Sequence, residues 1–413
     1  MDVATRVNGF VDWVKSIGLP WWATANSTAH GLQEYVLHRL DRIQQEHMWR
    51  GDDIMARVIE RPAEDMVREG WTIATGEADL DAQLALRMEQ LHVRERFQEA
   101  IRYQRGYGGG AVLLGADDGR EMALPPAVGL VHRVVWLQVI ESWELSAATW
   151  DNDLASETFG HPLTYRYSGS GQNTEIHRSR LLLFNGNVVS RAHRRERSGW
   201  GDPVSMRMLD AVKSYKLAWS VVGELLKGSS QPTLRLYQLY ALMETEKGED
   251  LARRRVQLFK EALSSMNVAV LDKDDAFERV AVNFAGVPEL LDRQAIRVSA
   301  SADIPATLLM GQSPGGMDAT GDSDIRGYYD RIHARQEVEL APHLKHLAAM
   351  LIAGLRPDYR GVVKVTFRPL WQMSELEQAQ SDRVRAETEQ VRTGARPAAQ
   401  PPRNGIAHSD AVT

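Results

Sequence analysis

The sequence predicts an α+β protein in which a strand-rich region lies between helical regions. Three observations support this fold class. Apolar residues recur every three or four positions through most of residues 31–104, which is the period of a helix. Residues 108–184 instead form short apolar runs separated by Gly, Asn, Asp and Pro, as strands and turns do. After residue 203 the helical period returns in several long segments.

Composition excludes several classes of protein. The 413 residues are 43% hydrophobic and 25% charged, with 49 basic and 55 acidic side chains and a formal net charge of −6. A protein that binds nucleic acid over its whole surface needs an excess of Lys and Arg, and this chain has more acidic than basic residues, so its composition argues against that class. The absence of Cys excludes disulfides and thiolate metal sites. Because there is neither an apolar run of roughly 20 residues nor a signal-peptide pattern, we expect an intracellular protein with no membrane partner.

The first helical region contains three predicted segments. An apolar stripe runs through residues 32–43 and includes Ile43. A second pattern begins at residue 54 and is interrupted at Pro62, because proline lacks the amide hydrogen that a helix uses. The longest early helix is predicted over residues 80–104.

Four strands follow in the middle region. The first is introduced by Gly108, Gly109 and Gly110 and ends in an Asp-Gly turn. The predicted strands cover residues 111–119, 133–140, 163–168 and 175–184.

Two long helices with a small insert come next. Helices are predicted over residues 204–228 and 249–266, and residues 233–239 between them alternate like a strand. Residues 267–284 resemble a hairpin. Two helices flanking such an insert predict an antiparallel pair with a cap at one end.

The most informative segment joins a linker to a long helix. Residues 311–321 are small, flexible and acidic, so their own contacts would order them poorly. The following helix, residues 325–353, carries a continuous stripe from Ile325 through Tyr328 and Leu340 to Leu351. A mobile loop on a long helix is typical of a gate, and an ordinary surface loop explains the spacing equally well. Residues 394–413 are rich in Pro and Ala and are predicted to be disordered.

Motifs for catalysis or metal binding are weak. Residues 106–110 have the glycines of a phosphate loop, without its Lys-Ser/Thr ending or its following helix. Three aspartates at 272, 274 and 275 begin like a calcium loop but lack the Gly and Glu that complete one. Asp318, Asp322 and Asp324 could ligate a cation, although a flexible loop would position them poorly. We therefore predict no catalytic residue, no metal and no cofactor.

Two further polar groups admit alternatives. His343 and His346, with Glu339, have the spacing of a surface metal site, and a solvated helix face is the simpler interpretation. Arginine is concentrated just before Trp200, and guanidinium groups suit a subunit interface, a nucleic-acid contact or a solvated loop. The predicted subunit-interface residues are Arg191, Arg194, Arg195, Arg197 and Trp200.

A series of motifs resembles one known family. The motifs are AEDMVREGWTI (63–73), GYGGGAVLLG (106–115), EIHRSRLLLFNG (175–186), SGWGDPV (198–204), SASADIPATLLMGQSPGGMDATGDSD (299–324) and VTFRPLWQMSE (365–375). In this order they resemble the phage portal proteins of a group once named only as a domain of unknown function. The resemblance covers roughly residues 30–390.

The resemblance implies an architecture of wing, stem, clip, channel loop and crown. It implies an N-terminal arm (1–30), a wing (31–203), stem helices (204–228 and 249–266) around a clip (229–248), a wing return (267–310), a channel loop (311–324), a long channel helix and strand (325–371), a reduced crown helix (372–393) and a disordered tail (394–413). The implied channel-loop residues are Gly311, Gln312, Ser313, Gly315, Gly316, Met317, Asp318, Thr320, Asp322 and Asp324. The implied clip residues, which would dock terminase or an adaptor, are Thr233, Arg235, Tyr237, Tyr240 and Glu244.

The same resemblance implies a structural function in the virion and no enzyme activity. Portal proteins form a ring, usually of twelve subunits, at one capsid vertex, and assemble in the host cytoplasm. Double-stranded DNA is packaged and ejected through the ring. The implied partners are other copies of the chain, DNA, the terminase large subunit, neck or adaptor proteins, and the major capsid and scaffold proteins. The alternatives are a metal-dependent enzyme acting on nucleic acid or nucleotides, and a different ring-forming neck adaptor.

Overall fold

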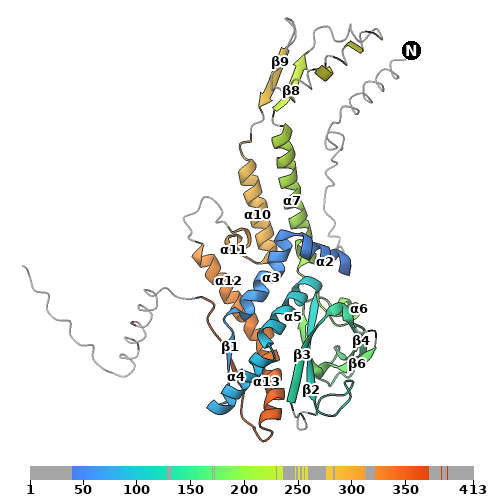
Figure 1. The fold of residues 1–413 in the computed structure, drawn as a ribbon, viewed down its shortest axis with the longest axis vertical. Coiled ribbons are helices and arrows are strands. Elements are labelled where there is room, and N and C mark those ends of the chain that lie inside the picture. The colour runs from blue at the N-terminus through green and yellow to red at the C-terminus, as the bar shows by residue number, and fades with distance from the viewer. Residues whose placement is uncertain are drawn as a thin grey trace, which may run out of the picture. The chain divides into compact units, whose positions relative to one another are not determined.

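The computed structural model describes residues 40–127, 131, 133–169, 171, 173–228, 230–235, 247, 250–251, 254, 256–258, 276–281, 284–311, 321–371, 383 and 388. It confirms the α+β class (Figure 1). The elements before residue 200 are α2 (Arg42–Gly51), α3 (Asp53–Arg68), β1 (Trp71–Ala74), α4 (Ala78–Gln90), α5 (Val93–Tyr107), β2 (Gly109–Asp117), β3 (Arg133–Glu141), β4 (Leu145–Trp150), β5 (Pro162–Tyr167), β6 (Thr174–His177), β7 (Leu181–Asn185) and α6 (Arg191–Glu196). The later ones are α7 (Ser205–Gly228), β8 (Ser230–Arg235), β9 (Ala276–Ala281), α10 (Val287–Ala302), α11 (Ala306–Met310), α12 (Asp322–Arg335), α13 (Ala341–Leu355) and β10 (Lys364–Phe367).

The early helices differ from the prediction in two places. The helix expected over residues 80–104 is two helices, because the chain turns at His92, which has a left-handed φ of 52°. Leu91 and Val93 on either side of the turn are both buried, so the break directs α4 and α5 into one core. Ile43, expected on an apolar stripe, is 63% exposed.

Pro62 does not interrupt α3, which continues to Arg68. Proline removes one helical hydrogen bond, and the carbonyl left without a donor is that of Val58. The guanidinium of Arg105, on α5, supplies the donors: its Nε and Nη2 lie 3.0 and 2.7 Å from the Val58 oxygen. Burial, with a smaller effect of Arg335, lowers the pKa of Arg105 to about 9, so the group is still protonated at neutral pH. The buried Arg105 guanidinium on α5 thus supplies the hydrogen-bond donor that Pro62 cannot supply to the Val58 carbonyl.

This pairing predicts a coupled effect on stability. Arg105→Met should lower the free energy of unfolding by about 1–3 kcal/mol, because the Val58 carbonyl loses its donors inside the core. In a Pro62→Ala background the new backbone amide can bond to the same carbonyl, so the loss should shrink. Urea unfolding of the two single variants and the double variant measures the coupling. Strictly additive losses would contradict this account of Arg105.

The middle region forms two antiparallel sheets of three strands each. One has the order β3-β2-β7 and the other β4-β5-β6. Strand β2 is buried along most of its length, since α5 contacts β2, β3 and β7. Helix α13 also contacts β3. The predicted strands are confirmed, except that residues 175–184 divide into β6 and β7 around a short 3-10 turn, Arg178–Arg180.

The glycines before β2 are packing positions and not a phosphate loop. A Cβ on Gly109 would lie 2.2 Å from the Trp200 ring, and one on Gly110 would lie 2.7 Å from the Ala100 carbonyl oxygen. Gly108 ends α5 with a left-handed φ of 83°. Because strand β2 and not a helix follows, Gly109 and Gly110 take part in the strand pairing of the sheet and do not bind a phosphate.

Helix α7 confirms the prediction for residues 204–228, but its partner differs. The helix that contacts α7 is α10, and antiparallel strands β8 and β9, with Ser230 opposite Ala281, connect the pair. The sequence had paired residues 204–228 with 249–266. Of the latter segment only 250–251, 254 and 256–258 are described, all helical. The predicted hairpin at 267–284 is described only through β9 and Phe284, and β9 pairs with β8.

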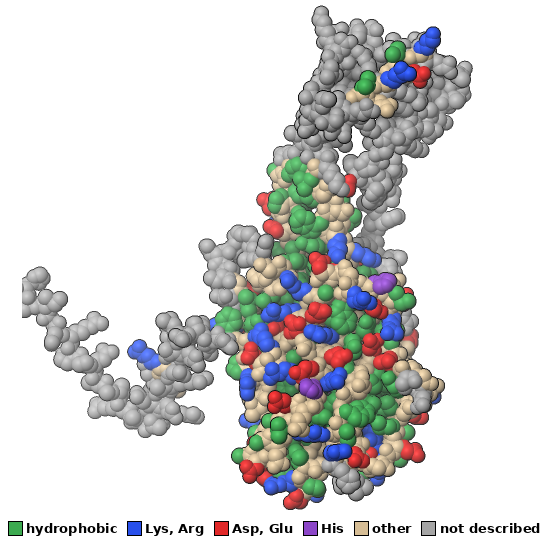
Figure 2. Space-filling view, viewed as in Figure 1, with side chains coloured by type: hydrophobic (Ala, Val, Ile, Leu, Met, Phe, Trp, Pro, Cys, Tyr) green, Lys and Arg blue, Asp and Glu red, His purple; other side chains and the backbone are tan. Residues whose placement is uncertain are grey.

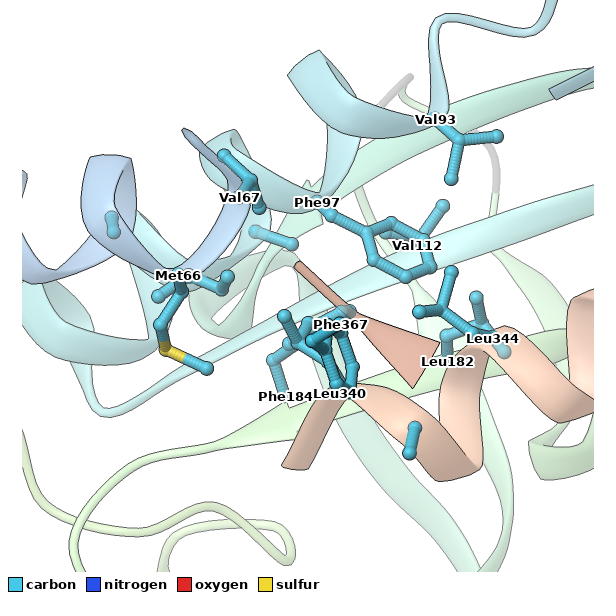
Figure 3. Close-up of a cluster of buried hydrophobic side chains, with 14 of the residues drawn as sticks. Met66, Val67, Val93, Phe97, Val112, Leu182, Phe184, Leu340, Leu344 and Phe367 are labelled. Carbon is cyan, nitrogen blue, oxygen red and sulfur yellow. The ribbon is translucent and has the colours of Figure 1, made fainter. Parts of the chain in front are cut away.

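The helix predicted over residues 325–353 is confirmed as a continuous run, α12 through α13, with a π-helical turn at Gln336–Leu340. Its stripe is buried: Tyr328 and Leu340 belong to the main core, as does Leu351. Figure 3 shows side chains from α3, α5, β2, β7, α13 and β10 meeting in this core, where Phe97 and Phe184 contact edge to face with ring centroids 5.4 Å apart. In the described part of the chain, no helix has the length and hydropathy needed to span a bilayer. Of the predicted crown helix only residues 383 and 388 are described, and the predicted N-terminal arm and tail lie outside the described residues.

Candidate channel edge and subunit surface

Two glycines flank residues 312–320 of the predicted channel loop. Gly311 ends α11 with φ 75°, and Gly321 precedes α12 with φ 67°. A Cβ on Gly321 would lie 3.1 Å from Thr307 Cγ2 of α11. Gly321 thus lies against α11, the helix that ends at Gly311. The predicted residues Gln312, Ser313, Gly315, Gly316, Met317, Asp318 and Thr320 lie outside the described residues, and Asp324 is exposed in the first turn of α12.

The upstream end of the segment is fixed to α3. Arg57 on α3 donates its Nη1 to the carbonyl oxygen of Leu309 at 2.7 Å. The Leu309 side chain is itself buried, as is Ile304 before α11. A C-terminal helix carbonyl has no partner within its helix, so a guanidinium donor stabilises this end.

The downstream end is fixed by a buried carboxylate. Asp65 on α3 is 1% exposed and accepts hydrogen bonds from Arg61 at 2.8 Å, Arg68 at 3.0 Å and the Tyr328 hydroxyl of α12 at 3.1 Å. Burial, and then the neighbouring Asp65, raise the pKa of Tyr328, so its hydroxyl remains a donor. We call Arg61, Asp65, Arg68 and Tyr328 the Asp65 network.

Further contacts extend the Asp65 network along α12. Arg68 also lies over the Tyr329 ring, 5.2 Å from its centroid, and donates Nη2 to the Leu370 carbonyl at 2.9 Å. Gln336, fully buried at the π-helical turn, donates to the Met66 carbonyl at 2.8 Å. Both ends of residues 311–321 thus rest on one helix, α3.

Sequence reasoning missed the Asp65 network. Arg61 and Asp65 are four residues apart, and Asp65 and Arg68 are three apart, which is the spacing of ordinary surface ion pairs. The burial that distinguishes Asp65 depends on α12, more than 260 residues later in the chain. Only the position of Asp65 beside the apolar Met66 and Val67 pointed to the core.

The histidines of α13 are neither a metal site nor a solvated face. The His343 ring lies 4.5 Å from the Phe184 ring centroid and hydrogen-bonds the Leu183 carbonyl. His346 Nε2 lies 3.0 Å from the Ser179 carbonyl oxygen. Glu339 instead pairs with Arg335 at 2.9 Å and accepts from Gln104 at 3.0 Å. The solvated-face interpretation is wrong because α13 packs on the strand region at these positions.

His343 gives the fold a pH dependence. Burial lowers the pKa of His343 from 6.5 to about 4, so the folded state keeps the ring neutral while the unfolded chain protonates it. The stability is therefore complete above pH 6.5 and falls as the pH is lowered toward about 4, by about 1–3 kcal/mol from this group. In a His343→Phe variant, urea unfolding between pH 7 and pH 4.5 should lose stability less steeply. An unchanged slope would contradict this assignment.

The arginine cluster forms a short helix, α6, rather than a loop. Arg191 lies over the Phe159 ring and Arg195 over the Trp150 ring, with guanidinium carbons 5.2 and 5.4 Å from the centroids. Arg191 and Arg195 are exposed and Arg194 is half-buried. These three remain candidates for a contact between subunits.

Trp200 and Arg197 act within the chain. Trp200 is 3% exposed, donates its indole N–H to the Leu145 carbonyl at 3.1 Å and fills the space above Gly109. Arg197 pairs with Asp202 at 3.3 Å and donates to the Tyr107 carbonyl at 3.3 Å. Trp200 is therefore a core residue and not a subunit-interface residue. Of the clip residues, Thr233 and Arg235 lie on β8, and Tyr237, Tyr240 and Glu244 fall outside the described residues.

An apolar surface that the sequence analysis did not single out lies on α7 and α10 (Figure 2). On α7, Leu217, Trp219, Val221 and Leu226 are 56%, 51%, 48% and 57% exposed. At 3.6 residues per turn, Leu217 and Val221 lie on one flank, and Trp219 and Leu226 lie on the opposite flank. On α10, Leu290 and Ile296 are 64% and 48% exposed. We call the two sides of α7 the Leu217 flank and the Leu226 flank.

The fold is similar to that of a chain in the neck of a gene transfer agent particle. The neck of a native gene transfer agent particle, computed with C12 symmetry, has a chain that matches with a TM-score of 0.50 and 13% identity, covering 85% of this chain and 89% of that chain. An HK97 family phage portal protein from Corynebacterium diphtheriae matches with a TM-score of 0.38 and 11% identity, covering 84% of this chain and 98% of that one.

The sequence also matches the phage portal protein family over residues 43–391. This match spans most of the chain, which therefore belongs to the phage portal protein family.

Similar curated proteins are longer than this chain. Two carry the name Anti-CBASS protein Acb1: one from Caulobacter sp. (strain RHG1), 29% identical over 84% of this chain, and one from Sphingomonas paeninsulae, 27% identical over 94% of it. The chain spans 58% and 63% of their lengths. An uncharacterized protein of Haemophilus influenzae is 29% identical over 84% of this chain and 79% of its own length.

Proposed function

We propose that the chain is the subunit of a portal ring, with about twelve copies around a channel for double-stranded DNA at a capsid vertex. The observation that carries this proposal is the pair of exposed apolar flanks on α7. A ring requires heterologous contacts, in which one face of each subunit meets a different face of the next. The Leu217 flank and the Leu226 flank are two such faces on opposite sides of α7. Their burial between neighbours would remove apolar area from water on every subunit.

Residues 311–324 are the proposed channel edge. The helices on either side of this segment, α11 and α12, both contact α3, and the Asp65 network holds α12. The segment carries acidic residues and no Lys or Arg. Each Lys or Arg that neutralises a phosphate adds salt-dependent affinity for DNA, so an acidic edge lets DNA pass without being held.

The remaining partners follow from this role. Residues 229–248 would form the clip and dock the terminase large subunit during packaging, and neck or adaptor proteins later. Arg191, Arg194 and Arg195 of α6 are proposed to face carboxylates of a neighbouring subunit. Major capsid and scaffold proteins would surround the ring at its vertex.

A role against CBASS, named for two relatives, is the second candidate function. Their matches cover 84% and 94% of this chain, and the portal family covers residues 43–391, so the shared sequence is largely the portal region. We place the anti-CBASS role with the part of those relatives outside the match. An enzyme that holds a metal at residues 318–324 would lose a metal-dependent activity on Asp324→Ala, whereas a portal subunit has none to lose.

The mass of the purified full chain tests the ring directly. Mass photometry at micromolar concentration should show a species of about twelve times the 46.3 kDa of one chain. A distribution confined to one or two chains would contradict the proposal. Because subunit number varies between preparations of rings, neighbouring multiples also support it.

Deleting residues 313–319 tests the channel edge. Because Gly321 lies against Thr307 of α11, a shortened connection should still join α11 to α12, and rings should form with an unchanged subunit number. We expect DNA retention in particles to fall, because the channel is no longer narrowed at this level. Packaged DNA protected from nuclease is the measurement. Intact rings with unchanged packaging and retention would show that the segment does not narrow the channel.

A further inference from the structure

A cavity of about 450 Å³ lies between α13 and the strands that carry the 3-10 turn at Arg178–Arg180. Its apolar wall contains Leu163, Leu181, Leu182 and Leu183. Its polar lining is Thr158, His177, Arg178, Ser179, Asn185, His343 and His346. The portal function proposed above uses none of these residues.

The lining contains a cation and no carboxylate. Three other cavities in the described part of the chain each have acidic residues: Asp81, Glu89 and Glu95 in one, Asp202 and Glu339 in another, and Asp303 in a third. Only Arg178 supplies a permanent charge here. The cavity is therefore suited to an anion.

Arg178 is half-buried, and its Nη1 is buried with no hydrogen-bond partner among the described residues. Arg178 also lines the cavity, so its guanidinium can donate to an anion bound there. The positive charge of Arg178 contributes to lowering the pKa of Asp151, after the hydrogen bonds that Asp151 accepts from Ser156, Thr158 and the Asp153 amide. No hydrogen bond or ion pair joins Asp151 to Arg178 among the described residues, so the guanidinium keeps donors for a ligand.

His177 supplies a second donor. Its Nδ1 accepts from the Ser179 amide at 3.3 Å and faces the Ser179 hydroxyl at 2.7 Å. These contacts place the proton on Nε2, the other ring nitrogen. Burial, and then the charges of Arg180 and Arg178, lower the pKa of His177, so the ring is neutral at pH 7 and donates without carrying charge.

We propose that this cavity binds a carboxylate carried on an apolar group. Arg178 and His177 hold the carboxylate, since a guanidinium and an imidazole N–H both donate to carboxylate oxygens. The leucine wall contacts the apolar part of the ligand. This wall is the reason to name a carboxylate on an aliphatic body rather than inorganic phosphate, which would gain nothing from leucine.

Saturation-transfer NMR on the full chain tests the proposal with defined probes. Hexanoate should give a saturable signal, and hexanamide, its neutral isostere, should bind at least tenfold more weakly. A charge-assisted hydrogen bond is worth this factor or more. N-acetyl-leucine, which presents the end of a peptide, is the second acid. Binding of either acid supports the site, and the tighter one tells whether the ligand is a free aliphatic acid or a chain terminus.

Two variants distinguish binding of hexanoate at this cavity from nonspecific binding elsewhere on the protein. Arg178→Gln should weaken hexanoate about tenfold, and Arg166→Gln, an exposed arginine on the same sheet, should leave it unchanged. Equal binding of hexanoate and hexanamide to the unaltered chain would overturn the proposal whether or not the variants fold. Phosphate binding as tight as hexanoate would also overturn it, because the apolar wall would then have no role.

Discussion

Glutamate at Leu217 or at Leu226 is expected to prevent ring formation. Each substitution places a charge on one flank of α7, and burying an unpaired carboxylate against a neighbour costs several kcal/mol. Because a ring needs both flanks of every subunit, either change alone should shift the mass from the ring to small species. Leu154→Glu is the matched control, since Leu154 is 82% exposed on a loop away from α7. Mass photometry of the three variants decides the outcome.

Mixing the two variants sharpens the test. A Leu217→Glu chain keeps its Leu226 flank, and a Leu226→Glu chain keeps its Leu217 flank. If the two flanks contact each other, a mixture should form pairs of unlike chains but no rings. If both single variants formed rings, α7 would not be part of the subunit interface. If one variant formed dimers without the other, the contact would be isologous.

Asp65→Ala is expected to lower the free energy of unfolding by about 3 kcal/mol. The change removes the acceptor of Arg61, Arg68 and the Tyr328 hydroxyl, and breaking a buried ion pair from one side leaves its partners uncompensated. Both arginines keep about a third of their surface in water, so the loss is smaller than for a fully buried pair.

Glu64→Ala provides the control for Asp65. Glu64 is the neighbouring carboxylate, its side chain is 47% exposed, and it pairs with Arg102 at 3.3 Å, so its loss should stay within about 0.5 kcal/mol. Urea unfolding measures both variants. If Asp65→Ala were no more destabilising than Glu64→Ala, the Asp65 network would not be what fixes α12 to α3.

Much of the fold could be predicted from the sequence because local patterns determine it. The stripe after Ile325 and the apolar run before Gly115 each predicted an element that the structure confirms. The break at His92 could not be predicted, since apolar residues continue through it with helical spacing. At Pro62 the sequence predicted an interruption that the structure does not have, because Arg105 on another helix supplies the donor that lets α3 continue.

The candidate site was harder to predict. The glycine-rich composition predicted a linker at residues 311–321 before a long helix, and α12 begins at Asp322, directly after it. The role of Asp65 could not be predicted, because it depends on the packing of α12 on α3. Trp200 was assigned to an interface because it follows an arginine cluster, while the space it fills is created by Gly109, 91 residues earlier. The sequence pairs α7 with residues 249–266, and that pairing stays a prediction, while the contact of α7 with α10 was not predicted because helical spacing alone does not show which helices meet.

Cryo-electron microscopy of the purified full chain tests the central claim most directly. The account predicts a closed ring with a central opening wide enough for duplex DNA, α7 and α10 of adjacent subunits in contact, and residues 311–324 at the inner edge. A particle without an opening, or a ring in which residues 311–324 lie on the outer rim, would contradict it.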